Sequence, residues 1–166
     1  MANALTLLNS QTLGTSSATV TFASISQAYR DLRVVTYNLI TATNANMSLQ
    51  FNGDTAANYS GVYYGFNYVP SVTTGTFTGT SIVDSRGYPT SSGGCMATID
   101  IFDYSATDKH KLAFMRSQGN PTINGQGLDI ITGRWANTAA ITSVTFSLST
   151  GSFAAGATFY LYGVSA

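Results

Sequence analysis

The sequence contains very little charge. Charged side chains make up 8% of the 166 residues, glutamate is missing altogether, and only two lysines are present. Helices normally place Glu, Lys and Arg on their solvated faces, so this composition excludes long solvent-exposed helices. The seven basic and seven acidic residues cancel to a formal net charge of zero. Nucleic acid is therefore not expected as a partner, because its binding needs a basic footprint.

The residues that build most catalytic and metal sites are also scarce. One histidine, His110, and one cysteine, Cys95, are present, so zinc sites with two histidines or several cysteines are excluded. His110 lies between Lys109 and Lys111, a setting typical of an exposed turn, and no glycine-rich phosphate loop is followed by a lysine. We therefore predict a protein that is not an enzyme, holds no cofactor and has no intramolecular disulfide.

Long apolar runs are missing as well. The first residues lack a basic segment followed by an apolar stretch, and no run reaches the ~18 apolar residues of a membrane-spanning helix. A protein made in a cytoplasm, with no membrane partner, is expected. The length of 166 residues fits a single domain, residues 1–166, in which residues 1–15 form a candidate N-terminal arm.

Hydroxylated and aromatic residues are abundant, and apolar residues recur with a period of two. This pattern predicts an all-β fold, an antiparallel β-sandwich of jelly-roll type. The expected strands are 18–23, 32–40, 47–51, 62–69, 77–83, 96–102, 111–116, 128–131, 141–148 and 158–162. The side chains expected to be buried are Leu32, Val34, Leu49, Phe51, Ile99, Ile101, Leu112, Phe114, Ile141, Phe146, Phe159 and Leu161.

Two groups of oxygen ligands deserve consideration as sites. Asn52, Asp54 and Asn58 lie in one loop and form a weak candidate for calcium, although Asx side chains also form turns with their own backbone. Asp100 and Asp103 are the carboxylates for a glycosidase-like acid/base pair. Their opposite strand parity places them on different faces, and Asp100 is expected to pair with an arginine or to face water.

Aromatic residues provide the best binding candidates. Tyr64, Phe66 and Tyr68 fall on one side of a predicted strand, and Tyr63 falls on the other side between two glycines. Flat aromatic rings stack on sugars, but they also fill cores and subunit interfaces. Tyr63, Tyr64, Tyr68 and Trp135 are therefore candidates for an interface or a glycan contact.

The order of several short motifs resembles a known family. The motifs are YRDLR (29–33), FNGD (51–54), NYS (58–60), GRW (133–135), TAAITSV (138–144), GSFAAG (151–156) and LYGV (161–164). Together they resemble short β-rich virion proteins of tailed bacteriophages, which are structural, decoration or tail-fibre-like. The resemblance extends from about residue 25 to the C-terminus. It implies a role in the particle and carries no catalytic residues.

These observations lead to one expected function and its alternatives. The first is a non-enzymatic capsid decoration (cement) protein, located in the virion and partnered by the major capsid protein or other virion proteins. The alternative is a tail-fibre, receptor-binding or adaptor protein that recognises host glycans, and the rival enzyme is a polysaccharide depolymerase. Strands such as 32–40 are partly apolar on both sides, which predicts self-association in a closed oligomer, a homotrimer.

Overall fold

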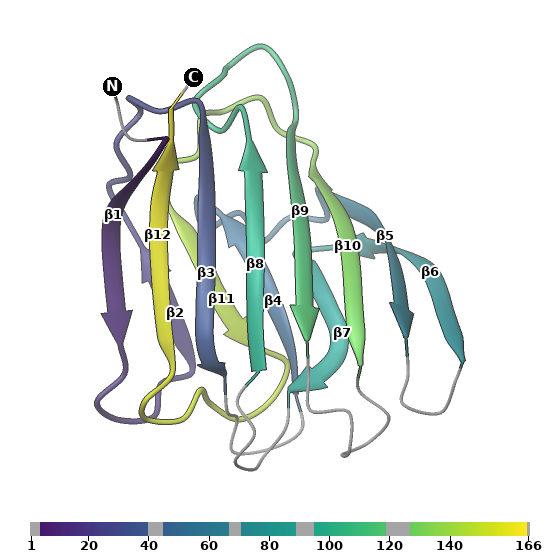
Figure 1. Cartoon of the computed structure of the whole chain (residues 1–166). Coiled ribbons are helices and arrows are strands. Elements are labelled where there is room, and N and C mark those ends of the chain that lie inside the picture. The colour runs from purple at the N-terminus through teal and green to yellow at the C-terminus, as the bar shows by residue number, and fades with distance from the viewer. Residues whose placement is uncertain (1–3, 40–44, 67–70, 89–94, 119–126, 166) are drawn as a thin grey trace.

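The computed structural model describes residues 4–39, 45–66, 71–88, 95–118 and 127–165. Every regular element in these ranges is a β-strand, and two antiparallel sheets pack face to face in a sandwich of the jelly-roll type, as the sequence predicts (Figure 1). These ranges hold no apolar helix that is long enough to cross a membrane.

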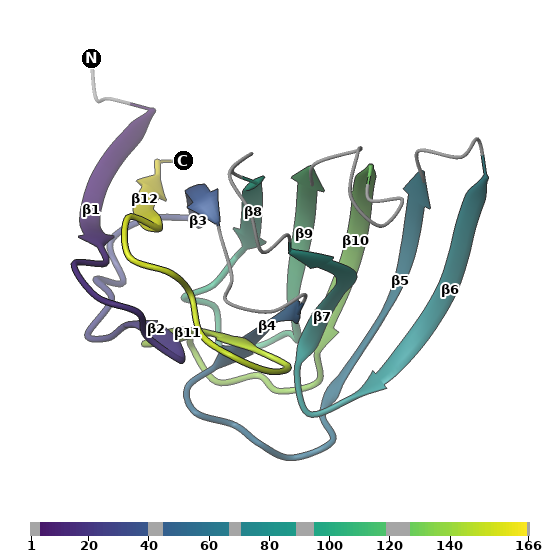
Figure 2. The same cartoon turned by 90° about the horizontal axis from the view of Figure 1, so that it is seen from below.

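The large sheet has eight strands and the small sheet has four. In spatial order the large sheet contains β1 (Leu5–Thr12), β12 (Thr158–Val164), β3 (Asp31–Leu39), β8 (Cys95–Phe102), β9 (Lys111–Gln118), β10 (Leu128–Trp135), β5 (Tyr59–Phe66) and β6 (Val72–Gly79). The small sheet contains β2 (Thr19–Phe22), β11 (Val144–Leu148), β4 (Ala45–Phe51) and β7 (Ile82–Tyr88). Figure 2 shows that the small sheet covers only part of the large one, and that β5 and β6 extend beyond it.

The core lies between the sheets and is made by alternate residues of each strand. Ten of the twelve side chains expected to be buried are at most 2% exposed. Phe51, Tyr59 and Trp135 form an aromatic cluster at one end, where the rings of Tyr59 and Trp135 stack with centroids 6.3 Å apart. Phe146, Phe153 and Phe159 form a second cluster. Such ring pairs contribute beyond the area they bury.

The prediction for Leu112 and Phe114 is wrong. Leu112 is 46% exposed and Phe114 is half-buried, whereas Lys111, Ala113 and Met115 of the same strand are buried. The pairing explains this parity, because Ala113 lies beside Ile101 of β8 on one side and Gly133 of β10 on the other, both on the inner face. Side-chain size alone therefore gives the wrong face for β9.

Two further expectations differ from the structure. Residues 1–15 are not simply an arm, because Leu5–Thr12 forms β1 and pairs with β12 at one edge of the large sheet. The predicted strand 77–83 is divided at Thr80 and Ser81, so that β6 ends in the large sheet and β7 begins in the small one.

Several glycines of the large sheet make room for a large side chain. A Cβ at Gly133 would lie 2.6 Å from the side chain of Ile82, which comes from the small sheet. A Cβ at Gly61 would lie 2.5 Å from the Phe77 ring, and one at Gly75 would lie 2.5 Å from the Tyr63 hydroxyl. Contacts this short have no place for a methyl group, so these positions depend on the absence of a side chain.

Candidate functional site

The candidate site is the outer face of the large sheet, the face turned away from the small sheet. All large hydrophobic side chains that are exposed in the described part of the chain lie on it. They are Leu5, Leu7, Tyr37, Val62, Tyr64, Phe66, Val72, Met96, Phe102, Leu112 and Leu128, which are 39–54% exposed. Single exposed hydrophobics are ordinary, but a set of this size on one face of a sheet marks an interaction surface.

The strand register places these side chains next to one another. One row across the sheet contains Met96, Gln118, Leu128, Phe66 and Val72, which pair in succession from β8 to β6. The half-buried side chains of Tyr160, Val35 and Ile130 lie two residues further along the strands, and the half-buried rings of Phe114 and Tyr162 lie four residues further along. The face is therefore rich in apolar side chains, which alternate with polar ones such as Thr98 and Arg116.

A charged cluster lies near the middle of the outer face. Arg33 Nε donates to Asp100 Oδ1 at 2.6 Å, and Arg116 Nη2 donates to Asp100 Oδ2 at 3.3 Å. The hydrogen bond to Asp100 raises the pKa of Arg33. Asp100 is 12% exposed at its side chain, whereas Arg33 is 37% and Arg116 is 47% exposed. Arg134 is also exposed on this face, so the charge that the described part of the face presents to a partner is cationic.

A cavity of about 230 Å³ opens on the same face, beside this cluster. Its lining includes Met96 and Thr98 of β8, Arg116 and Gln118 of β9, and Leu128 of β10. A guanidinium, an amide and a hydroxyl thus meet two apolar walls, which is the chemistry of a small polar ligand site. Beyond Leu128, Tyr64 and Phe66 form an edge-to-face ring pair with centroids 5.1 Å apart.

The outer face of the small sheet has the opposite chemistry. Its outward-pointing residues on β2, β11 and β4 are Thr19, Thr21, Thr145, Ser147, Asn46, Ser48 and Gln50. The hydroxyls of Thr21 and Thr145 lie 3.0 Å apart across the β2–β11 pair. This face is suited to water, and only the outer face of the large sheet is suited to an apolar partner.

The four aromatic candidates from the sequence separate in the structure. Tyr64 lies exposed on the outer face. Tyr63 points to the inner side of β5 and lies over Gly75 of β6. The candidate role of Trp135 is wrong. Its side chain is 1% exposed, and its indole N–H donates to Asp54 Oδ2 at 2.7 Å. The ring therefore belongs to the core and contacts neither a glycan nor a subunit. Tyr68 lies outside the described residues.

The oxygens of the calcium candidate serve the loop itself. Asn52 Oδ1 accepts from the backbone N–H groups of Thr142 and Ser143 at 2.8 and 3.1 Å. Asp54 accepts from the Asn58 side chain at 2.9 Å and from the Trp135 indole, and these hydrogen bonds, that of Asn58 first, lower the pKa of Asp54. Asn58 therefore points its amide N–H at Asp54 and takes part in a turn network, which is the alternative that the sequence left open.

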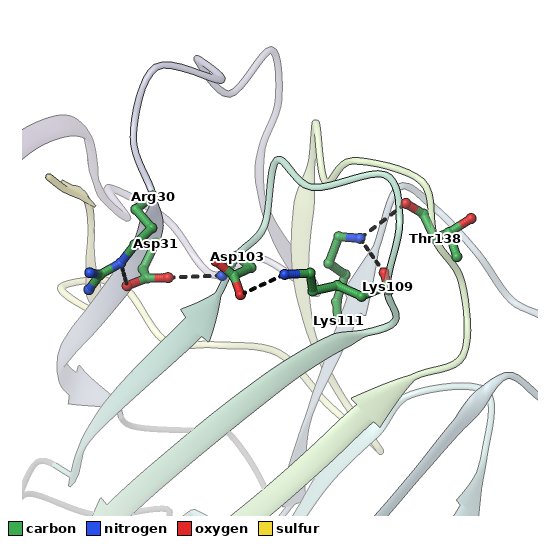
Figure 3. A network of polar contacts seen from close by, with 6 residues as sticks. All are labelled: Arg30, Asp31, Asp103, Lys109, Lys111 and Thr138. Carbon is green, nitrogen blue, oxygen red and sulfur yellow. Dashed lines mark hydrogen bonds and ion pairs between the residues drawn. The ribbon is translucent and has the colours of Figure 1, made fainter. Parts of the chain in front are cut away.

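The carboxylates considered for catalysis are held by cations. Asp100 accepts from both arginines of the outer face, as expected. Asp103 lies in the turn after β8, where Lys109 Nζ is 3.4 Å from its Oδ2 (Figure 3). Lys111, the first residue of β9, is buried and donates to the carbonyl oxygens of Lys109 and Thr138. His110 is exposed. Burial lowers the pKa of Lys111.

Sequence reasoning missed most of the outer face because it assigned large apolar residues to the core. Alternation predicts Met96, Phe102 and Leu128 only as strand residues, and it predicts Leu112 in the core. The available signal is the sequence 111–116, in which both sets of alternate positions hold apolar residues, Leu112 and Phe114 on one side and Ala113 and Met115 on the other. An apolar residue on each side of several adjacent strands indicates a second buried or binding face.

Neither a protein-family model nor a curated protein sequence matches the chain. Among solved structures, exo-inulinase from Aspergillus awamori is similar over 96% of this chain and 29% of its own, with 11% identity and a TM-score of 0.48. Galectin LEC-6 from Caenorhabditis elegans is similar over 95% and 96%, with 7% identity and a TM-score of 0.39. Domains LG4-5 of the mouse laminin α1 chain reach 12% identity and a TM-score of 0.39. The chain spans less than a third of the exo-inulinase, and these likenesses concern the sandwich fold alone.

Proposed function

We propose that the protein is a non-enzymatic structural subunit of a tailed-bacteriophage particle, a capsid decoration protein that stabilises the shell. It docks its outer face on neighbouring particle proteins, and its small sheet faces the solvent. The observation that carries this proposal is the gathering of all described exposed large hydrophobics on one face, opposite a face of hydroxyl and amide groups. The motif order that resembles phage virion proteins supports the same proposal.

The size of the outer face agrees with a docking role. With side chains 39–54% exposed, the eleven hydrophobics present roughly 900 Å² of apolar surface, whereas a stable interface needs about 800 Å² from each partner. The partner surface that fits is apolar and carries carboxylates opposite Arg33, Arg116 and Arg134, because the exposed charge of this face is cationic.

The copy number of the protein in purified virions tests its place in the particle. A decoration protein covers the shell and is present in hundreds of copies, whereas a tail-tip protein is present in about a dozen. We expect a gel band of the protein comparable to that of the major capsid protein. A band amounting to a few per cent of the capsid protein contradicts decoration.

Binding to capsids that lack the protein tests the docking face. In a co-sedimentation assay, Leu112→Lys combined with Met96→Lys is expected to weaken capsid binding at least tenfold, because two charges would be buried against an apolar partner. The matched control is Ser48→Lys on the small sheet, which leaves capsid binding unchanged. If the control weakens binding and the outer-face variant does not, the orientation proposed here is wrong.

Recognition of host-surface glycans by a tail protein is the second candidate function. The cavity beside Arg116 and Gln118, next to the ring pair of Tyr64 and Phe66, favours it, because glycan sites combine planar hydrogen-bonding groups with exposed rings. On a glycan array, Arg116→Gln and Tyr64→Ala would each abolish binding, while Tyr37→Ala, an exposed ring on β3, would not. A wild-type chain that binds no glycan on an array of host polysaccharides contradicts this function.

A further inference from the structure

The described residues form a sandwich with four edge strands, and three of these edges are interrupted or short. β2 has only four residues, the pairing of β1 with β12 shifts register between Leu7 and Asn9, and the pairing of β4 with β7 shifts between Ala45 and Met47. β6 is different, because its eight residues pair with β5 in eight consecutive pairs without a shift. Short edges and bulges are the devices by which proteins prevent pairing with another chain.

The sequence of β6 offers no other protection. VTTGTFTG contains no charged residue and no proline, which are the remaining devices that make an edge unsuitable for pairing. No strand of the described chain pairs with β6 on the side away from β5. An unbroken, uncharged edge of eight residues is a template for one more antiparallel strand.

The β5–β6 ribbon is also accessible and firmly built. It extends beyond the small sheet, so no second layer stands in front of the β6 edge (Figure 2). The ribbon is held by its own side chains: Phe77 lies over Gly61 directly opposite, and Tyr63 lies over Gly75 directly opposite. An aromatic ring that covers a cross-strand glycine stabilises a strand pair, so the edge is presented in a defined, extended shape.

We propose that β6 pairs antiparallel with β6 of a second copy of this chain about a two-fold axis, which joins the two large sheets into one. A two-fold interface brings like residues together, and β6 suits this because it has no charge to repel its own copy. Val62, Tyr64, Phe66 and Val72 lie on the outer face at this end of the sheet, so the apolar outer faces of the two copies become continuous across the junction.

This pairing differs from the trimer expected from the sequence. A closed ring would need β6 to pair with a different edge of the next copy, and the other edge of the large sheet, β1, is interrupted by its register shift. The self-complementary β6 edge avoids that mismatch. The sequence predicts Tyr63 at a subunit contact; it lies on β5, one strand from the proposed junction, and its ring covers Gly75 of β6. The proposal rests on strand geometry and is independent of the docking of the outer face.

Light scattering of the purified full chain at tens of micromolar tests the proposal, with a dimer as the expected result. Thr74→Lys with Thr76→Lys, both at exposed outer-face positions of β6, is expected to raise the dimer dissociation constant at least tenfold. Thr19→Lys with Thr21→Lys on β2, also exposed, is the matched control and remains dimeric. A wild-type monomer, a wild-type trimer or a β6 variant that stays dimeric overturns the proposal.

A mixing experiment separates a lost interface from a damaged fold. The variant with Thr74→Lys and Thr76→Lys is mixed with a variant carrying Thr74→Asp and Thr76→Asp, and circular dichroism first shows that both keep the β spectrum. Opposite charges on facing strands attract, so the mixture is expected to form heterodimers while each variant alone is monomeric. Failure of the two folded variants to associate with each other contradicts pairing through β6.

Discussion

The two outward faces of the sandwich differ although the strands behind them follow the same alternation. On β2, β11 and β4 of the small sheet the outward residues are threonine, serine, asparagine and glutamine, whereas many outward positions of the large sheet carry leucine, methionine, phenylalanine or tyrosine. A period of two establishes that a strand is present, but it identifies the buried side only where the two sides differ in polarity. The small sheet meets that condition and much of the large sheet does not.

The largest difference in stability between a buried and an outer-face substitution is expected for Trp135 and Tyr64. Trp135→Ala should destabilise the fold by about 3–5 kcal/mol, because it removes a buried ring and leaves Asp54 without the indole donor. Tyr64→Ala on the outer face should cost about 0.5 kcal/mol or less. Urea unfolding followed by far-UV circular dichroism, which reports on the backbone, measures both changes. Equal losses of unfolding free energy would contradict the assignment of the two faces.

The same comparison can be made within one strand, between a buried and an exposed residue of β9. Met115→Ala should cost about 2–4 kcal/mol because Met115 is 1% exposed. Leu112→Ala should cost about 0.5 kcal/mol or less because its side chain already faces solvent in the single chain. The two changes remove similar apolar volumes from one strand, so a reversed order in chemical denaturation would mean that β9 has the opposite parity.

The parity of β9 also shows which parts of the fold can be predicted from the sequence. The sandwich class and ten of the twelve core side chains follow from alternation, because residues such as Leu49 and Phe51 stand between polar neighbours. Leu112 cannot be placed in this way, because its inward neighbours include Lys111, whose ammonium group donates to the carbonyl oxygens of Lys109 and Thr138. The site is less predictable than the fold: the sequence makes Tyr64 a candidate and the structure places it exposed on the outer face, whereas the charged cluster depends on pairing between β3, β8 and β9.

Acid should weaken the end of the sandwich that Asp54 holds together. The pKa of Asp54 is lowered from its ordinary value of 3.8, chiefly by the hydrogen bond from Asn58. A carboxyl whose pKa is lowered by folding stabilises the folded state above its unfolded pKa, and this contribution is lost as the pH falls through the folded pKa. The urea concentration at the unfolding midpoint of the wild type should therefore decrease as the pH falls below about 4. In the Asp54→Asn variant the midpoint should depend less on pH in that range.

The smallest change in stability is expected when the polar face is made more like the apolar one. Ser48→Val lies beside Val83 on the outer side of the small sheet, and it should alter the free energy of unfolding by about 0.5 kcal/mol or less. Its effect should instead appear in solubility, because an apolar pair would be added to the face that meets water. Turbidity in ammonium sulfate measures this, and an unchanged precipitation point would count against a solvent-facing small sheet.

The glycines that lie beneath large side chains should evolve together with the residues that cover them. Gly133 leaves room for the side chain of Ile82 from the other sheet, and Gly75 leaves room for the side chain of Tyr63. A side chain can return to one of these glycines only after its partner has become smaller, and a partner that shrinks first leaves a gap that a new Cβ can fill. Substitutions at each pair should therefore be inherited together in related sequences. Such paired changes would identify relatives of this chain even where the rest of the sequence has diverged.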